Sequence, residues 1–320
     1  MIKDILENIL SGGELSFEEA RALLDTKEED MPLLMRAANI VRKRYCGDKI
    51  DLCSLVNAKS GLCPEDCKFC GQSSKYDTGC SVYPLIDVGK IVEEAKLAKE
   101  NRATNFCIVI SGTGPTMDDF EKIKEAIKRI KEEVGISVDC SLGKLERSQV
   151  IELRELGIER YNHNLETSEK YYSSICTTHP YSMRRDTARL LKEEGMDLCC
   201  GGIIGLGESK EDRLNLAFDL KKLDVGCVPI NILNPKKGTP LEDEKKLSVS
   251  DIVKTVAVFR LILKKSTIKI AGGREYALGD LQNMAFMAGA NGMIIGGYLT
   301  TQGREVEKDI KMVKDLGFDI

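Results

Sequence analysis

From residue 50 onward, short β-branched segments alternate with longer amphipathic segments, and this alternation constrains the fold more than any other feature. In the longer segments, apolar residues recur three and four positions apart, which is the period of a helix with one buried face. We expect strands at 50–57, 106–112, 136–142, 159–164, 197–204, 227–233, 267–271 and 292–296. We expect helices at 88–100, 119–133, 146–156, 182–195, 209–223, 248–265, 277–289 and 305–316. Eight strands, each followed by one helix, predict an α/β fold of the TIM-type (β/α)8 barrel class.

An open, doubly wound sheet is the alternative fold, but such sheets more often stop at five or six strands. Helical periodicity without a strand precedes the first β-branched segment, so we expect residues 1–45 to form an N-terminal helical extension. The barrel is then expected to span residues 46–320. A chain of 320 residues is an ordinary length for one such barrel.

Charge and hydropathy exclude two classes of partner. Lys and Arg number 47 against 51 Asp and Glu, a net charge of −4 that disfavours nucleic acid. The first twenty residues are charged and lack the apolar centre of a secretory signal. No uncharged apolar run approaches the roughly 18 residues of a membrane-spanning helix. We therefore expect a cytoplasmic protein with neither a nucleic acid nor a membrane as its partner.

The chain contains twelve cysteines, more than a cytoplasmic protein of this size needs for structure. Disulfides are rare in a reducing compartment, so such an excess points to metal binding or redox chemistry. Free cysteines also serve as small buried apolar residues, and this interpretation suits Cys46, Cys80 and Cys176. The remaining cysteines require another explanation.

A cysteine-rich loop, AKSGLCPEDCKFCGQSSKY, follows the first predicted strand and carries Cys63, Cys67 and Cys70 in a C-x3-C-x2-C spacing. Three thiolates hold three irons of a [4Fe–4S] cluster and leave the fourth iron open to another ligand. A zinc site would normally require a fourth Cys or His nearby. The next such residue, Cys80, lies outside the usual spacing. The spacing therefore favours a cluster whose open iron binds a small molecule.

The loop string GLCPEDCKFCGQSS, with YNHNLETS and GGIIGLGE downstream, resembles the biotin synthase family of radical S-adenosylmethionine enzymes. The resemblance runs from about residue 40 to the end. It implies that S-adenosylmethionine binds the open iron and yields a 5′-deoxyadenosyl radical, and that sulfur is inserted into dethiobiotin to give biotin. It also implies an auxiliary iron–sulfur cluster as the sulfur donor, a reductant of the flavodoxin or ferredoxin type, and a homodimer.

The same resemblance assigns individual residues to the two ligands. The residues expected to bind S-adenosylmethionine are Phe69, Asn164, Glu166 and Arg184, of which Asn164 and Glu166 face the ribose hydroxyls and are expected at the catalytic site. The residues expected to bind dethiobiotin are Asn162, Asn164, Asn231, Thr300 and Thr301. His163 has the opposite strand parity to its asparagine neighbours, so we expect a structural role for it.

Three further cysteines, Cys107, Cys140 and Cys199, match the auxiliary-cluster ligands of the family. The chain departs from the family pattern at Lys269, where the family has an arginine ligand, and at Cys53 and Cys227, where it has serines. A protonated lysine cannot bind iron. We therefore expect a [4Fe–4S]-type auxiliary cluster held by the three matched cysteines and by at least one of Cys53 and Cys227, with Cys200 a weaker candidate. The alternative is that Cys53 and Cys227 only pack, and that a desolvated, neutral Lys269 helps to hold a [2Fe–2S] cluster.

Two other functions remain open. Radical S-adenosylmethionine enzymes of the hydrogenase-maturation or pyrrolysine pathways share the barrel and the loop, although the CPEDC string favours biotin synthase. A non-catalytic iron–sulfur electron carrier would usually be small and would supply four protein ligands to each cluster.

Overall fold

The structure, a computed structural model, describes residues 1–301 and 303–320. One sheet of nine strands runs in the order β5-β4-β3-β2-β1-β9-β8-β7-β6, and an additional pairing of β5 with β7 closes it. All of these pairings are parallel. The strands are β1 (Asp51–Lys59), β2 (Asn105–Ile110), β3 (Ser137–Ser141), β4 (Arg160–Asn162), β5 (Asp197–Cys199), β6 (Gly202–Ile204), β7 (Cys227–Ile232), β8 (Thr267–Ile270) and β9 (Gly292–Ile294). Since β5 and β6 follow each other along one edge of β7, the barrel has eight strand positions, and the predicted (β/α)8 fold is confirmed.

The strand expected at 197–204 is interrupted between β5 and β6. A Cβ atom on Gly201 would lie only 2.0 Å from the carbonyl oxygen of Pro229, so only glycine fits where the chain passes β7 at this point. Below the interruption, Cys199 pairs with Cys227 on β7, and above it Gly202 pairs with Ile230. The break therefore lets the chain continue along β7 while it presents Cys199 at mid-barrel.

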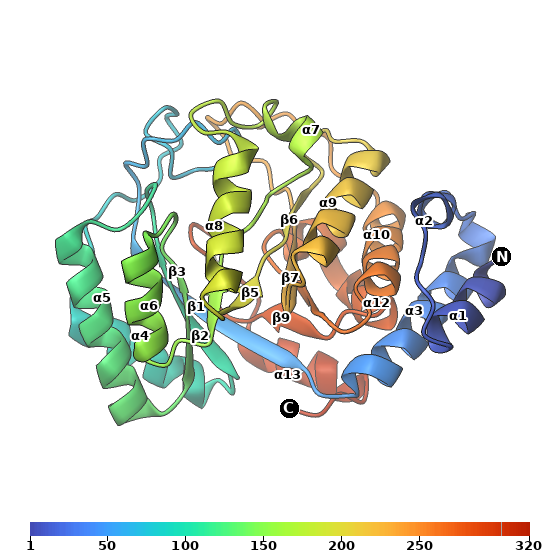
Figure 1. Cartoon of the computed structure of the whole chain (residues 1–320), viewed down its shortest axis with the longest axis horizontal. Helices are drawn as coiled ribbons and strands as arrows, with labels where there is room; N and C mark the ends of the chain where they lie inside the picture. Colours follow the sequence, from blue (N-terminus) through green and yellow to red (C-terminus); the bar gives the residue numbers. More distant parts are fainter. Residues whose placement is uncertain (302) are drawn as a thin grey trace.

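Helices cover the outside of the barrel, as Figure 1 shows. They are α4 (Val88–Glu100), α5 (Met117–Arg129) with the π turn η2 (Ile130–Val134), α6 (Arg147–Glu155), α7 (Glu169–Tyr172), α8 (Tyr181–Glu193), α9 (Lys210–Lys222), α10 (Val249–Ile262), α11 (Arg274–Leu278), the 3-10 turn η3 (Gly279–Gln282), α12 (Asn283–Met287) and α13 (Val306–Asp315). Thr116, Ser209 and Ser248 cap α5, α9 and α10 by accepting a backbone N–H, which explains where these helices begin.

Four elements precede the barrel: α1 (Ile2–Leu10), α2 (Phe17–Leu24), the 3-10 turn η1 (Glu28–Asp30) and α3 (Met31–Cys46). In Figure 1 they lie together at one side of the barrel, beside α10. The buried apolar residues of α3 include Leu34, Ala37 and Val41, which share the main hydrophobic core with the barrel helices. The N-terminal helices therefore add to the outer layer of the fold.

Two helical predictions differ from the structure. The helix expected at 277–289 is divided into α11, η3 and α12, because the backbone at Gly279 has a positive φ of 53° and leaves the helical region again at Leu281. The short helix α7 was not expected, since four residues are too few to show a helical period. None of the helices in the described part of the chain is long and apolar enough to cross a membrane.

Candidate active site

A cavity of about 430 Å³ opens where the carboxyl ends of the strands meet their loops and reaches down into the barrel. Ligands of (β/α)8 barrels bind at this face. The predicted site residues that line it are Cys53, Cys63, Cys67, Phe69, Cys70, Cys107, Asn162, Asn164, Glu166, Arg184, Cys199, Asn231, Thr300 and Thr301. The fold therefore brings most of the predicted residues, which span almost 250 positions of the sequence, to one cavity.

The cysteine-rich loop is held by its own backbone. The N–H of Cys63 donates to the carbonyl of Gln72 at 3.0 Å, and the N–H of Ser74 donates to the carbonyl of Cys63 at 2.8 Å. Lys68 N–H donates to the carbonyl of Ile175 at 2.9 Å, which ties the loop to the segment before α8. Three thiols close together on a fixed loop at the mouth of a cavity fit three irons of a cubane cluster.

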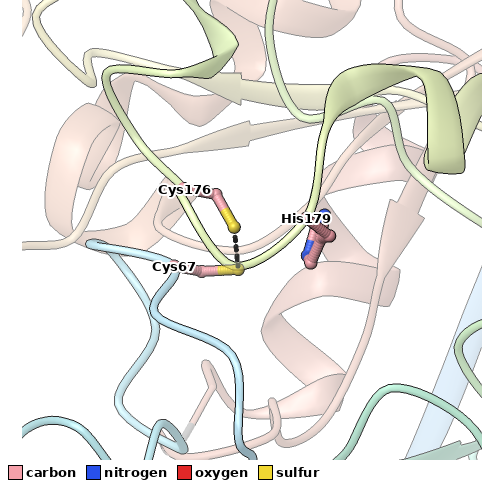
Figure 2. Close-up of side chains that lie close together, drawn as sticks. All are labelled: Cys67, Cys176 and His179. Carbon is pink, nitrogen blue, oxygen red and sulfur yellow. Dashed lines mark hydrogen bonds between the residues drawn. The ribbon is translucent and has the colours of Figure 1, made fainter.

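Asp66 fixes the same loop to residues 177 and 178. Its carboxylate accepts hydrogen bonds from the N–H groups of Thr177 at 2.8 Å and Thr178 at 3.1 Å. Cys176 and His179 are consequently placed beside Cys67, as Figure 2 shows, and the sulfur of Cys176 lies 3.8 Å from that of Cys67. Sequence reasoning treated Cys176 as a packing residue and gave His179 no role; the spacing of the motif carries no signal for either of them.

Arg184 organises the polar wall of the cavity. Its Nε donates to the Tyr172 hydroxyl at 2.6 Å and its Nη1 donates to the carbonyl of Asn164 at 3.1 Å. Nη1 also lies 3.6 Å from Oε1 of Glu166. Burial raises the pKa of Glu166, although the Arg184 charge opposes this. Glu166 occupies the left-handed backbone region, with φ at 71°, and its Oε2 has no hydrogen-bond partner within the described residues.

The two asparagines expected at the substrate differ in how far they are already bonded. Asn162 donates from Nδ2 to the sulfur of Cys107 at 3.2 Å, while its Oδ1 is buried without a partner among the residues described. Asn231 donates to the carbonyl of Gly202 at 3.3 Å and accepts from the N–H of Gly272 at 2.9 Å. Asn162 therefore has a free acceptor for a ligand, whereas Asn231 is held in a fixed orientation.

His163 also lines the cavity, which strand alternation did not lead us to expect. The reason is that β4 ends at Asn162, so the alternation no longer applies to the next residue. Burial, with the nearby charge of Arg184, lowers the pKa of His163 to about 3. The ring is therefore neutral.

The cavity wall fits S-adenosylmethionine at Glu166 and Arg184 and a polar substrate at Asn162. Glu166 Oε2 and Asn162 Oδ1 are buried acceptors that lack a partner among residues 1–301 and 303–320. Such atoms are costly unless a ligand supplies donors, and hydroxyl and amino groups are donors of this kind. The guanidinium of Arg184 on the same wall is suited to a carboxylate.

Strand register determines which of the remaining cysteines face the barrel interior. Cys53 and Cys107 pack with Val109 in a small cluster inside the barrel that is separate from the main core. Cys199 lies beside Cys227 in the sheet, and burial together with this neighbour raises the pKa of Cys199. Four thiols from β1, β2, β5 and β7 therefore point into the lower part of the barrel.

Cys140, which the sequence predicts as an auxiliary-cluster ligand, is not among them. In the register of β2 and β3, Cys107 lies beside Asp139 and Ile108 lies beside Cys140. Neighbours in a parallel sheet point to the same face, so Cys140 faces outward with Ile108, and both belong to the main core beneath the helices. Asp139 faces inward and accepts a hydrogen bond from Asn105 at 2.5 Å. A register difference of one residue reverses the face of a strand, so Asp139 rather than Cys140 is on the side of Cys107.

A buried ion pair lies below the four thiols. Lys269 Nζ is 2.8 Å from the carboxylate of Asp51, and Arg160 Nη1 is 3.2 Å from the same carboxylate. Burial alone would lower the pKa of Lys269, but Cys227, Cys53 and Asp51 together raise it well above its usual value. Lys269 is therefore an ammonium group in its ion pair with Asp51.

Residues 59–220 match the Radical SAM superfamily, and residues 229–319 match the Biotin and Thiamin Synthesis associated domain. The chain is 45% identical to the biotin synthase of Carboxydothermus hydrogenoformans, over 99% of this chain and 98% of the relative. It is also 45% identical to the biotin synthase of Pelotomaculum thermopropionicum, over the full length of both chains.

Solved structures of other enzymes share the fold at lower identity. Methylornithine synthase matches with a TM-score of 0.83 and 21% identity, over 98% of this chain and 96% of the synthase. The FeFe-hydrogenase maturase of Carboxydothermus hydrogenoformans matches with a TM-score of 0.84 and 21% identity, over 99% of this chain and 78% of the maturase. At this identity the likeness extends to the fold alone, whereas the full-length identity to biotin synthases identifies the family.

Proposed function

Because the chain belongs to the biotin synthase family of radical S-adenosylmethionine enzymes, we propose that it converts dethiobiotin to biotin by radical sulfur insertion. It uses a [4Fe–4S] cluster, S-adenosylmethionine and an auxiliary iron–sulfur cluster. The observation that carries the proposal is the arrangement of two groups of thiols on one cavity: three at its mouth, and three deeper on its wall with Cys227 beside them. A substrate between the two groups would face the radical source on one side and sulfur on the other.

At the mouth of the cavity, Cys63, Cys67 and Cys70 hold three irons of the [4Fe–4S] cluster. When S-adenosylmethionine is bound and reduced there, it supplies a 5′-deoxyadenosyl radical that removes hydrogen from unactivated carbon.

Arg184 holds the carboxylate of the methionine portion of S-adenosylmethionine. Asn164 and Glu166 hold the ribose hydroxyls, for which Glu166 has a free acceptor. Phe69, which lines the cavity, would lie against the adenine and exclude water from that side.

The substrate lies deeper, between the polar wall and the interior thiols. Asn162 and Asn231 orient the ureido ring, and Thr300 and Thr301 bind the carboxylate tail at the cavity rim. Asn162 also bonds the sulfur of Cys107, so one side chain contacts both the substrate and a ligand of the sulfur source. This contact would bring the substrate close to the residues that would hold the sulfur source.

The auxiliary cluster is held by Cys53, Cys107, Cys199 and Cys227. Four thiols are the ligand set of a [4Fe–4S]-type cluster, and all four face the same interior space. Lys269, paired with Asp51, closes the space from below as a positive charge that offsets the thiolates. This ligand set includes both Cys53 and Cys227 and omits Cys140.

The proposal includes a cytoplasmic enzyme that acts as a homodimer and takes electrons from a flavodoxin- or ferredoxin-type protein. Membership of the biotin synthase family supports these parts. The near balance of 47 basic and 51 acidic residues supports the absence of a nucleic acid partner.

An anoxic turnover assay tests the proposed function. The cluster-loaded chain is mixed with S-adenosylmethionine, dithionite and dethiobiotin, and biotin and 5′-deoxyadenosine are quantified. We expect biotin to form, with 5′-deoxyadenosine as the co-product. Release of 5′-deoxyadenosine without biotin would identify a radical enzyme with another substrate, and release of neither would identify an electron carrier.

A further inference from the structure

Cys176 and His179 lie beside the cysteine-rich loop but have no part in the function proposed above. Figure 2 shows their side chains converging on Cys67 from the segment between α7 and α8. One ligand atom from each of the three residues lies within 4.8 Å of the other two, and all three side chains are buried. Two thiols and an imidazole are the donors that zinc and similar divalent cations prefer.

The separation of the two sulfurs suits a tetrahedral cation. Cys67 Sγ and Cys176 Sγ are 3.8 Å apart. With metal–sulfur bonds of about 2.3 Å, two sulfurs at a tetrahedral angle also lie about 3.8 Å apart. A cation therefore fits between them with little movement of the backbone.

The surroundings of His179 resemble those of a metal ligand. The hydroxyl of Tyr172 lies 3.0 Å from Nδ1 of His179, and Arg184 donates to the same hydroxyl at 2.6 Å. Metal-binding histidines usually have their second ring nitrogen held in this way, which fixes the ring and frees the other nitrogen. Nε2 lies 3.8 Å from Oε2 of Glu65, so a carboxylate is close to the free ring nitrogen.

We propose that, before its clusters are installed, the chain binds one thiophilic divalent cation, Zn²⁺ or Fe²⁺, through Cys67, Cys176 and His179, with solvent at the fourth position. Binding releases the two thiol protons to solvent and changes no oxidation state. The proposed function adds a consequence, because Cys67 is also a ligand of the [4Fe–4S] cluster. The cation and the cluster exclude each other, so cluster installation must first displace the cation.

Cobalt binding tests the site without reference to activity. The full chain, stripped of metal and reduced, is titrated with Co²⁺, and the thiolate-to-cobalt charge-transfer band and the visible bands of tetrahedral cobalt are recorded. Because the interior thiols can also bind cobalt, we expect one of the bound equivalents to depend on Cys176 and His179. C176A and H179Q should each weaken binding more than roughly tenfold, since even an outer-shell partner is worth about 10–100-fold. The double variant C63A/C70A, which lacks the other two loop thiols, should bind cobalt as the unmodified chain does.

The opposite pattern overturns the proposal. If C63A/C70A loses cobalt while C176A and H179Q retain it, the cation binds the three loop cysteines. Thermal unfolding of each variant shows whether a loss of cobalt binding is caused by misfolding. If C176A is misfolded, H179Q still tests the site. In a second arm, Zn²⁺ added before iron and sulfide should slow cluster assembly in the unmodified chain but not in C176A. This arm depends on the proposed function, whereas the cobalt titration does not. Equal slowing in both chains would overturn the exclusion of cluster by cation.

Discussion

The thiols at the mouth of the cavity and those inside the barrel are built in opposite ways. Cys63, Cys67 and Cys70 lie within one loop that its own backbone hydrogen bonds hold together. The interior thiols come from four strands, and only the closed sheet brings them together. A site formed by one loop is visible in the sequence as a motif. A site assembled from several strands forms only if each strand has the register that turns its cysteine inward. The two sites should therefore respond differently to substitution.

The largest effect is expected at the mouth. Replacing Cys63 by Ala removes one iron ligand and should abolish 5′-deoxyadenosine formation, because no radical forms without the loop cluster. Cys80→Ala is the matched control, since Cys80 is a half-buried cysteine close to the same loop but outside the motif. The measurement is anoxic chromatography of the nucleoside product. Equal product from both variants would remove Cys63 from the cluster.

Inside the barrel, loss of one thiol should abolish only one of the two products. In Cys199→Ala we expect no biotin but continued cleavage of S-adenosylmethionine, because the loop cluster is intact. Cys200→Ala is the control, since its side chain lies in the main core on the other side of the chain. Both products are quantified in the same reaction. Biotin formation by Cys199→Ala but not by Cys200→Ala would reverse the assignment of faces.

The ion pair below the interior thiols predicts a loss of stability rather than of iron. Lys269→Met leaves the buried Asp51 carboxylate without its closest partner and should lower the free energy of unfolding by about 3–5 kcal/mol. Lys264→Met, which breaks a more exposed pair with Glu14, should cost about 1 kcal/mol or less. Denaturant titration measures both, and iron analysis checks the auxiliary cluster. Loss of auxiliary iron with unchanged stability would make Lys269 a ligand.

A smaller effect is expected between the two sites, at Asn231. Replacement by Ala removes a buried hydrogen-bonding group and should weaken dethiobiotin binding by about 1–3 kcal/mol, or roughly 5–150-fold. S-adenosylmethionine binding should change far less. Because the Asn231 amide also bonds Gly202 and Gly272, thermal unfolding is recorded alongside the two affinities. Equal weakening of both ligands would place Asn231 outside the substrate site.

The smallest effect should follow substitution of Cys140. Because its side chain packs under the helices, Cys140→Ala should cost about 1 kcal/mol of stability and leave iron content and biotin formation unchanged. Iron content and biotin formation, measured on the same preparation, show whether Cys140 is a cluster ligand. A variant that loses auxiliary iron would return Cys140 to the ligand set.

The fold was predictable because each strand and helix carries its own local period, and the barrel follows from their number. The cysteine-rich loop was predictable for the same reason. Alternation along β7 places Cys227 and Asn231, four positions apart, on one face. At Cys140 the sequence carries no sign of which face the side chain takes, and the pairing of Cys107 with Asp139 determines it.

Other features lie beyond what a sequence pattern carries. The contact between Cys67 and Cys176 joins residues 109 positions apart and depends on Asp66 holding the backbone of Thr177 and Thr178. The position of His163 depends on where β4 ends, which tertiary pairing decides. In both cases the determinant is a tertiary hydrogen bond between two segments, neither of which has an unusual composition.

The left-handed backbone of Glu166 sets stability against function at one position. A residue with a Cβ atom in this conformation costs about 1–2 kcal/mol, and glycine would remove most of that cost. Glycine would also remove the carboxylate that faces the cavity. Selection for heat resistance alone would therefore favour glycine at position 166, while selection for turnover keeps an acid there. A directed-evolution experiment that screens only for thermostability would select substitutions at this position. The selected enzyme would unfold at a higher temperature and have lower activity.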